Sequence, residues 1–247
     1  MDTIREAATV MLLRDAPELQ VFMLRRNPQI LFAPGASVFP GGALDEADRD
    51  PELLARCRGR DDGAASRLLG QGRGGLGFWV AAIREAFEEA GVMLGVPGSF
   101  GLDGLAGART ALAAGEHSFL DLVVAGDLVL DCGALRPFAH WITPPRAPRR
   151  YDTWFFAAAA PEGHTYRHDD HETVASGWVT PAEALRLGAA GDIELIRPTQ
   201  RSLELLGGFC SSAAFLDAVA AAEAATVGPL LGSPTGMLAL EPERVAG

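Results

Sequence analysis

Residues 84–92 read Arg-Glu-Ala-Phe-Glu-Glu-Ala-Gly-Val, and this stretch organises the rest of the chain. On a helix, Glu85, Glu88 and Glu89 stand at positions i, i+3 and i+4 and therefore share one face. Like charges at this spacing repel by roughly a few tenths of a kcal/mol per pair. A divalent cation such as Mg²⁺, which prefers carboxylate oxygens, reverses that repulsion. The stretch therefore predicts a metal platform for phosphate chemistry, against the alternative of an ordinary solvated acidic face.

Three features near this stretch favour the metal platform. Arg84 directly precedes the first glutamate, and Gly91 follows the acidic turn, where a helix can end in the left-handed conformation. Upstream, residues 39–42 read Phe-Pro-Gly-Gly at the end of an expected strand, and paired glycines permit positive φ and close backbone approach. We expect a helix over residues 78–90, with its apolar residues toward the core and its glutamates facing away from that core.

These residues resemble the Nudix box, Gly-x5-Glu-x7-Arg-Glu-U-x-Glu-Glu-x-Gly-U, where U is a bulky apolar residue. The second half of the box matches residues 84–92, and residues 39–42 resemble its opening. Three features depart from the family pattern. Asp48 stands where the family usually has Glu, Ala86 is small for a U position, and the spacer from Asp48 to Arg84 is far longer than the family's. The long spacer resembles the coenzyme A diphosphatase branch, whose peroxisomal member carries an insertion inside the box.

The resemblance implies an α/β fold, namely a Nudix-type α/β/α sandwich with a mixed β-sheet. We expect one Nudix domain over residues 1–226, in which residues 49–77 form an insertion within the box and residues 181–226 form a C-terminal helical extension. Residues 227–247 are expected to be a loosely attached tail, because proline and glycine punctuate them. Arginines give the insertion local basic character, which is compatible with a substrate-facing lid or with a solvated surface excursion.

Hydrophobic patterning predicts further strands and helices. The expected strands are an antiparallel hairpin at residues 9–13 and 19–24, and later strands at residues 138–142 and 153–159. Asp50 and Pro51 suit the N-cap and the first position of a helix in the insertion. Residues 94–115 are glycine-rich, and we expect a helix only within residues 105–113 of this segment. Residues 212–225, rich in alanine, are expected to form a late helix.

The resemblance also implies roles for the residues of the box. Glu85, Glu88 and Glu89, together with Gly42, are expected to bind Mg²⁺ or Mn²⁺. Glu85 additionally helps to orient or deprotonate the attacking water. Arg84 is expected to orient a box glutamate through charge-assisted hydrogen bonds rather than to touch substrate.

Further candidates for catalytic and substrate-binding residues lie outside the box, in loops and at strand ends. Glu172 resembles a family position where a further Glu assists the metals or acts as base. The basic loop arginines are candidates for a substrate phosphate, with ordinary surface positions as the alternative, and an aromatic residue beside them is a candidate for stacking on a base. These substrate-binding candidates are Arg25, Arg26, Arg146, Arg149, Arg150 and Tyr151.

The function implied by the resemblance is hydrolysis of the pyrophosphate bond of a nucleoside diphosphate linked to another moiety, with coenzyme A or acyl-coenzyme A as the expected substrate. Hydrolysis of ADP-ribose, a dinucleotide or a nucleotide sugar is the alternative in the same class. A Nudix-like ligand-binding module without catalysis is the alternative from another class, and the intact set of Arg84 and three glutamates argues against it.

The composition of the chain limits the classes of binding partner and the cellular compartments that we expect. The chain has 247 residues, a formal net charge of −11 and a pI near 4.9, which argues against non-specific binding of nucleic acid. No segment approaches the roughly 20 apolar residues of a membrane span. Cys57, Cys132 and Cys210 form no paired metal-binding motif, and we expect a reducing cytoplasmic location. The expected partner is a small nucleotide-derived molecule, and a homodimer stays open.

Overall fold

The computed structural model describes residues 4–29, 33–145, 147, 149–226, 228–231 and 235–240. The strands of its central sheet are β1 (Arg5–Asp15), β2 (Leu19–Arg26), β3 (Ala36–Val38), β4 (Gly41–Ala43), β8 (Arg136–Ile142), β9 (Tyr151–Ala159), β10 (Thr173–Val179), β11 (Glu194–Leu195) and β12 (Gly236–Met237). A smaller sheet contains β5 (Cys57–Arg58), β6 (Gly95–Val96) and β7 (Val129–Asp131).

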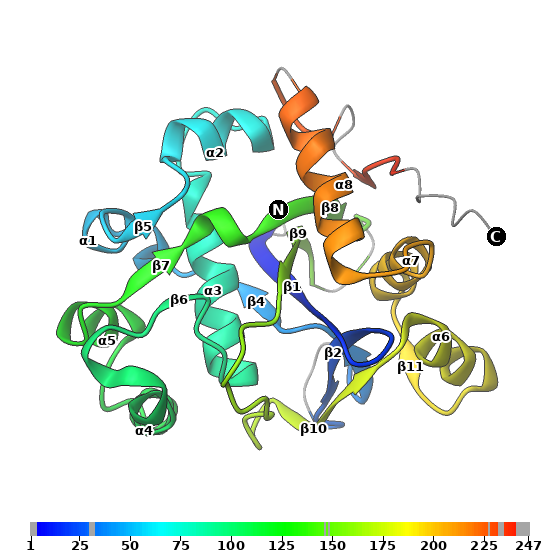
Figure 1. The fold of residues 1–247 in the computed structure, drawn as a ribbon, viewed down its shortest axis with the longest axis horizontal. Helices are drawn as coiled ribbons and strands as arrows, with labels where there is room; N and C mark the ends of the chain where they lie inside the picture. The colour runs from blue at the N-terminus through cyan, green and yellow to red at the C-terminus, as the bar shows by residue number, and fades with distance from the viewer. Residues whose placement is uncertain are drawn as a thin grey trace.

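The central sheet is mixed and runs in the order β11-β3-β2-β1-β9-β8-β12, with β4 paired to β1 and β10 paired to β2 (Figure 1). β1 pairs in parallel with β9 and antiparallel with β2, which confirms the expected hairpin. The strands expected near residues 138–142 and 153–159 are β8 and β9, and they pair antiparallel.

Helices cover both faces of this sheet. They are α1 (Pro51–Leu54), α2 (Asp62–Leu69), α3 (Leu76–Ala90), α4 (Gly101–Ala113), α5 (Phe119–Ala125), α6 (Pro181–Ala190), α7 (Arg197–Leu206) and α8 (Ser212–Ala225). Short 3-10 turns lie at Glu46–Arg49, Gly98–Phe100 and Cys132–Ala134. In Figure 1, α3 lies against the sheet on the side of the insertion, whereas α6, α7 and α8 gather on the other side of the molecule.

The two layers follow from the alternation of side chains along the strands. On β1, Val10 and Leu12 join the core that contains α3, whereas Met11 and Leu13 join a second core with residues of α6, α7 and α8. All four side chains are buried. This arrangement confirms the α/β/α sandwich with a mixed sheet.

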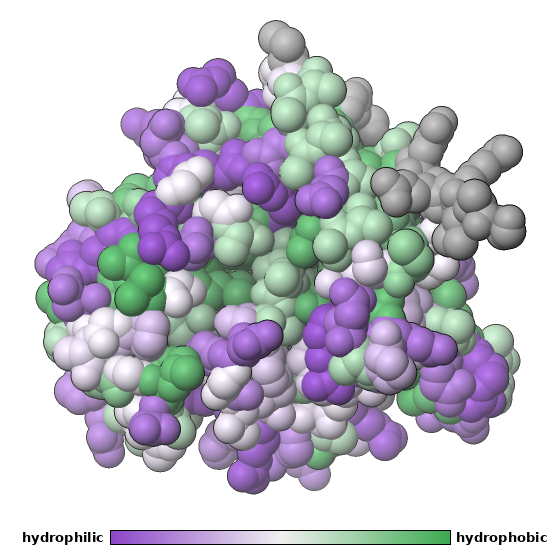
Figure 2. All heavy atoms as spheres, viewed as in Figure 1, coloured by the Kyte–Doolittle hydropathy of each residue, from purple (hydrophilic) through white to green (hydrophobic). Residues whose placement is uncertain are grey.

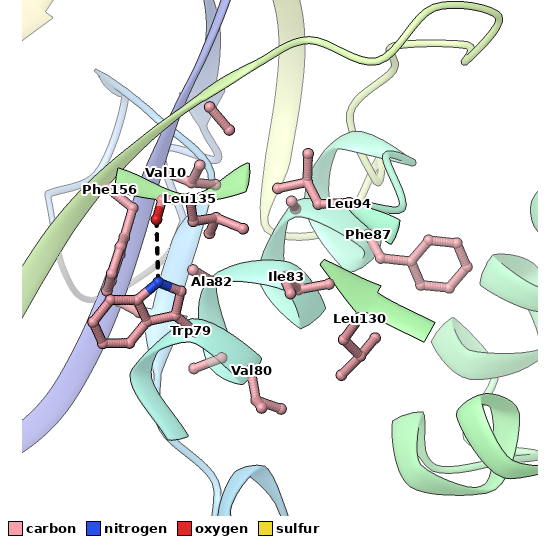
Figure 3. Close-up of a cluster of buried hydrophobic side chains, with 14 of the residues drawn as sticks. Val10, Trp79, Val80, Ala82, Ile83, Phe87, Leu94, Leu130, Leu135 and Phe156 are labelled. Atoms are coloured by element: carbon pink, nitrogen blue, oxygen red, sulfur yellow. Dashed lines mark hydrogen bonds between the residues drawn. The ribbon is translucent and has the colours of Figure 1, made fainter. Parts of the chain in front are cut away.

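The larger core is centred on α3. Trp79 is fully buried, its ring lies 4.8 Å from that of Phe156 in an edge-on arrangement, and its indole N–H donates to the carbonyl oxygen of Leu135 at 3.2 Å (Figure 3). The hydrogen bond satisfies a polar group that would otherwise be costly to bury. Figure 3 also shows Ile83 and Phe87 on the same helix, so the apolar residues of α3 pack into the core as expected.

The insertion forms a compact surface layer. The side chain of Asp50 accepts from the backbone N–H of Glu52, and Pro51 opens α1, as the sequence predicts. β5 pairs in parallel with β7, and α2 packs against α3. The glycine-rich segment that follows β6 differs from expectation, because α4 already begins at Gly101. Packing of Leu105 and Ala108 against the core outweighs the low helix propensity of glycine there.

The described part of the C-terminal tail is attached to the domain, contrary to expectation. Leu230 is buried, and its backbone N–H donates to the carbonyl oxygen of Leu68 at 2.7 Å. β12 adds a short antiparallel strand to β8. Just before the tail, α8 spans the expected residues, and Figure 2 shows pale apolar side chains at the surface over this alanine-rich helix.

Candidate active site

The acidic residues lie in the last turns of α3, which ends at Gly91 with φ 74°, the expected left-handed cap. Glu85 and Glu89 are only 8% and 4% exposed, so these carboxylates are buried and do not form a solvated acidic face. The strand β4 and the turn before it cover them. Glu88 is the more exposed of the three, with 33% of its side chain accessible.

Arg84 connects the acidic groups. Its guanidinium donates two hydrogen bonds to the carboxylate of Asp48, at 2.9 and 3.0 Å, and one to the carbonyl oxygen of Ala43 at 2.9 Å. The nitrogen Nη1 donates to Glu85 at 2.8 Å and to Glu88 at 3.2 Å. The arginine therefore fixes the orientation of two box glutamates, and its fork geometry suits the two-point contact with Asp48.

Asp48 is itself held in place. Its side chain is 1% exposed, and one carboxylate oxygen accepts from the backbone N–H of Asp45 at 2.8 Å. The residue that stands at the first acidic position of the box thus binds the arginine of the second half across the insertion. The shorter Asp side chain reaches Arg84 because the 3-10 turn Glu46–Arg49 packs against α3.

The paired glycines allow the backbone to approach the glutamates. The N–H of Gly41 donates to Glu89 at 2.9 Å. A Cβ atom on Gly42 would lie 2.4 Å from Oε1 of Glu85, so no larger residue fits without moving that carboxylate. Both glycines lie in β4, and neither has the positive φ that the sequence suggested. They are needed for close approach and not for a turn.

Burial and mutual repulsion raise the pKa values of the glutamates. Burial, opposed by Arg84 and reinforced by Glu88, raises the pKa of Glu85 to about 7. Burial also raises the pKa of Glu88, and burial together with the charge of Glu85 raises the pKa of Glu89. Burial alone would lower the pKa of Arg84, but its hydrogen bonds and the surrounding carboxylates outweigh that effect and raise it. The negative charge of the ionised carboxylates in the cluster therefore exceeds the single positive charge of Arg84.

This donor set suits a divalent cation. Buried carboxylates crowded beside one another, with glycine backbone next to them, are the oxygen ligands that Mg²⁺ and Mn²⁺ prefer. In the part of the chain that the structure describes, however, no three acidic, histidine or cysteine side chains already converge as metal ligands. Instead, Nη1 of Arg84 donates to both Glu85 and Glu88.

A cavity of about 850 Å³ opens beside the cluster, a volume suited to a small organic ligand. Glu85, Glu88 and Arg84 line it together with Gly41 and Gly42. Another part of the wall comes from β8, β9 and the segment between them, and a third from the first turn of α7. The cavity therefore joins the acidic cluster to aromatic and basic side chains.

The structure brings some of the predicted binding residues to this cavity and leaves others away from it. Arg26, Tyr151 and Glu172 line it, and Nη2 of Arg26 lies 4.0 Å from a carboxylate oxygen of Glu172. Arg25 is exposed and does not line it, because neighbouring residues of a strand point to opposite faces.

The arginines of the loop before β9 are placed differently from expectation. Arg149 and Arg150 do not line the cavity, and Nε of Arg150 donates to the carbonyl oxygen of Thr143 at 3.1 Å. That bond closes the loop on itself. Arg146 lies outside the described residues.

Sequence reasoning missed several residues of the cavity wall. Trp141 lies on β8, and Arg197 and Thr199 lie in the first turn of α7. The position of α7 follows from β11, which precedes it and pairs in parallel with β3, the strand that leads toward the paired glycines. Parallel strands end at the same edge of a sheet, but their pairing is not visible in the sequence.

The comparisons with known proteins agree with this site. The family model described as the NUDT19 Nudix domain matches residues 64–204. Two relatives named acyl-coenzyme A diphosphatase NUDT19 are each 30% identical to this chain: the Gallus gallus protein, over 84% of this chain and 69% of its own length, and the Homo sapiens protein, over 79% of this chain and 62% of its own length. The chain thus spans about two thirds of the length of these relatives.

The fold has a similar solved structure. A Nudix hydrolase from Alicyclobacillus acidocaldarius superposes with a TM-score of 0.67 at 29% identity, over 83% of this chain and 92% of that one. The family match, the relatives and the box residues gathered around Arg84 lead to the same conclusion. The chain belongs to the Nudix hydrolase family, and within it to the NUDT19 type.

Proposed function

We propose that this protein hydrolyses the pyrophosphate bond of coenzyme A or an acyl-coenzyme A in a reaction that depends on Mg²⁺ or Mn²⁺. The observation that carries the proposal is the cluster of Glu85, Glu88 and Glu89, of which Glu85 and Glu88 are held by Arg84 and line a ligand-sized cavity. The substrate class rests on the relatives named acyl-coenzyme A diphosphatase.

Glu85, Glu88 and Glu89 would hold the cation, with the backbone of Gly42 beside it. A divalent cation there would offset the charge of the pyrophosphate oxygens and lower the pKa of a bound water. Arg84 would keep its contacts with Asp48 if Glu85 or Glu88 turned toward the cation. Glu172 is exposed and lines the cavity, which supports a role for it as the group that accepts a proton from the attacking water.

The remaining cavity wall supports binding of the substrate. Arg26 offers positive charge for a phosphate, and the aromatic rings of Tyr151 and Trp141 offer a surface on which the adenine base can stack. We do not assign Arg25, Arg149 or Arg150 to the substrate, since none of them lines the cavity.

The two alternative functions make different predictions. A pyrophosphatase acting on ADP-ribose, a dinucleotide or a nucleotide sugar would use the same acidic cluster and differ in its products. A ligand-binding module would bind the nucleotide without turnover. The intact set of Arg84 and three glutamates favours an enzyme, because a non-catalytic module would not need the complete acidic cluster.

A hydrolysis panel with product identification tests the proposal. Coenzyme A, acetyl-coenzyme A, ADP-ribose, NADH and a nucleotide sugar are each incubated with the protein and Mg²⁺, with a chelator as the control. We expect phosphopantetheine-containing products and adenosine 3′,5′-bisphosphate from the coenzyme A pair. Cleavage of only ADP-ribose, NADH or the nucleotide sugar would show that the substrate is not coenzyme A or an acyl-coenzyme A. Binding without any cleavage would favour the ligand-binding module.

We also propose a cytoplasmic location for this protein. Cys57, Cys132 and Cys210 are free thiols, which fits the reducing cytoplasm that we propose. No helix among the described residues has the length and apolar character needed to cross a bilayer. Measurement of the molecular mass in solution distinguishes a homodimer from a monomer.

A further inference from the structure

We propose that the first turn of α7 is a binding site for a second, terminal phosphate of the substrate, separate from the pyrophosphate that is cleaved. In coenzyme A this group is the 3′-phosphate of the ribose, so the site would select 3′-phosphorylated nucleotides. The inference rests on the proposed function and adds a specificity-determining subsite to it.

The first observation is the free N-terminus of α7. The residue at the N-cap position is Ile196, whose side chain cannot accept a hydrogen bond, and no side chain caps this ten-residue helix. Pro198 removes one backbone donor, which leaves the N–H groups of Arg197 and Thr199 in the first turn without intrahelical acceptors. These groups and the helix dipole make this end of α7 attractive to an anion.

The second observation is Thr199 itself. The residue is 2% exposed and lines the cavity, and its hydroxyl makes no hydrogen bond within the described residues. The hydroxyl is not among their buried polar atoms that lack a partner, so it stays accessible from the cavity, where a phosphate oxygen can accept its hydrogen bond. This side chain therefore points to a ligand independently of the helix terminus.

The third observation is the charge of Arg197. Its side chain is exposed at the cavity wall, and within the described ranges no acidic group lies within 4.0 Å of it. The next arginine of the helix, Arg201, instead pairs with Glu204 at 2.6 Å and does not line the cavity. Arg197 is thus the arginine of α7 that can give two hydrogen bonds to a phosphate.

The place of this turn in the sheet sets its relation to the acidic cluster. β11 pairs in parallel with β3, with Glu194 opposite Ala36 and Leu195 opposite Ser37. α7 begins one residue after β11, and the paired glycines of the box begin β4, two residues after β3. Both therefore lie at the same edge of the sheet and open into the same cavity.

A phosphate monoester is the group that fits this turn best. It carries between one and two negative charges near neutral pH, and here it meets a guanidinium, a hydroxyl and two backbone donors. The pyrophosphate would need the carboxylate cluster and its cation, and those carboxylates belong to α3 and not to α7. A substrate with both groups would contact both elements of the cavity lining.

The kinetic test compares coenzyme A with dephospho-coenzyme A, which lacks only the 3′-phosphate. For the wild-type protein we expect kcat/KM to be higher for coenzyme A by at least about tenfold, mainly through KM, as for a charge-assisted hydrogen-bonding site. In Arg197→Ala and in Thr199→Val this preference should fall toward one. Arg201→Ala is the matched control on the same helix and should keep the wild-type preference.

The outcomes separate this inference from the proposed function. Equal kcat/KM values for the two substrates in the wild type, or an equal loss for both in Arg197→Ala, would overturn the subsite while leaving the hydrolase intact. If neither substrate is cleaved, the proposed function fails. A binding measurement then tests whether the phosphate subsite exists. Calorimetry with chelator present should then show that the wild type binds adenosine 3′,5′-bisphosphate more tightly than AMP, whereas Arg197→Ala and Thr199→Val bind the two equally. Equal affinities in the wild type would overturn the phosphate subsite.

Discussion

Arg84 and Asp48 form a buried two-point ion pair although 36 residues separate them in the chain. The pair joins the two halves of the Nudix box across the insertion, and it holds the arginine whose other nitrogen contacts Glu85 and Glu88. Asp48 thus acts as a positioning residue for the acidic cluster.

Asp48→Asn should destabilise the protein. The substitution leaves a buried guanidinium with less compensating charge, and breaking a buried ion pair costs about 3 kcal/mol or more. Urea denaturation measures the loss. Asp131→Asn is the control, because its ion pair with Arg58 is largely exposed and should contribute at most about 1 kcal/mol. Equal losses for the two variants would contradict the role given to Asp48.

Much of this site was predictable from residue types and local spacing. The acidic turn, the helix cap at Gly91 and the partnership of Arg84 with box glutamates follow from short-range patterns. The burial of Glu85 and Glu89 does not, because it depends on β4, which approaches them from more than 40 residues upstream. The cavity wall from α7 likewise depends on the pairing of β11 with β3, a long-range contact.

Stability should depend on pH in a way that a cation alters. The pKa of Glu85 is raised to about 7 in the folded protein, so the folded state keeps a proton that the unfolded chain loses near pH 4. For this group, metal-free stability is greatest below the unfolded pKa and declines as the pH rises through about 7. The raised pKa values of Glu88 and Glu89 act in the same direction.

Mg²⁺ or Mn²⁺ should therefore raise Tm more at about pH 8 than at about pH 5.5, because a cation binds the carboxylates only after they lose their protons. Thermal unfolding with and without the cation measures the difference. Glu85→Gln should abolish most of the pH-dependent gain. A gain in Tm that is the same at both pH values would argue against binding at this cluster.

Gly42→Ala should impair catalysis more than folding. The new Cβ would lie 2.4 Å from Oε1 of Glu85 and would displace that carboxylate. A misplacement of about 1 Å can cost about 100-fold in turnover. Gly72→Ala is the matched control, since no atom lies within 4 Å of its Cβ position. Steady-state kinetics compares the two, and normal turnover in Gly42→Ala would show that close approach to Glu85 is not required.

The insertion should prove structural rather than a substrate lid. Arg60 forms a buried ion pair with Glu223 on α8 and lies over the ring of Trp79 at 4.7 Å. None of the described residues 49–77 lines the cavity. Arg60→Met should lower Tm while KM for the substrate stays near the wild-type value. Arg67→Ala, at an exposed position of α2, serves as the control for stability. A large rise in KM for Arg60→Met without a loss of Tm would instead support the hypothesis that the insertion is a substrate-facing lid.

The central claim is that the carboxylates at the end of α3 hold the cation that hydrolysis requires. The most direct measurement is Mg²⁺-dependent turnover of coenzyme A by Glu89→Gln, beside the wild type and Glu183→Gln, an exposed glutamate of α6. We expect Glu89→Gln to remain folded and to lose about 1,000-fold or more in kcat, since its contribution is electrostatic, whereas Glu183→Gln keeps wild-type turnover. Near-wild-type turnover by folded Glu89→Gln would contradict the claim.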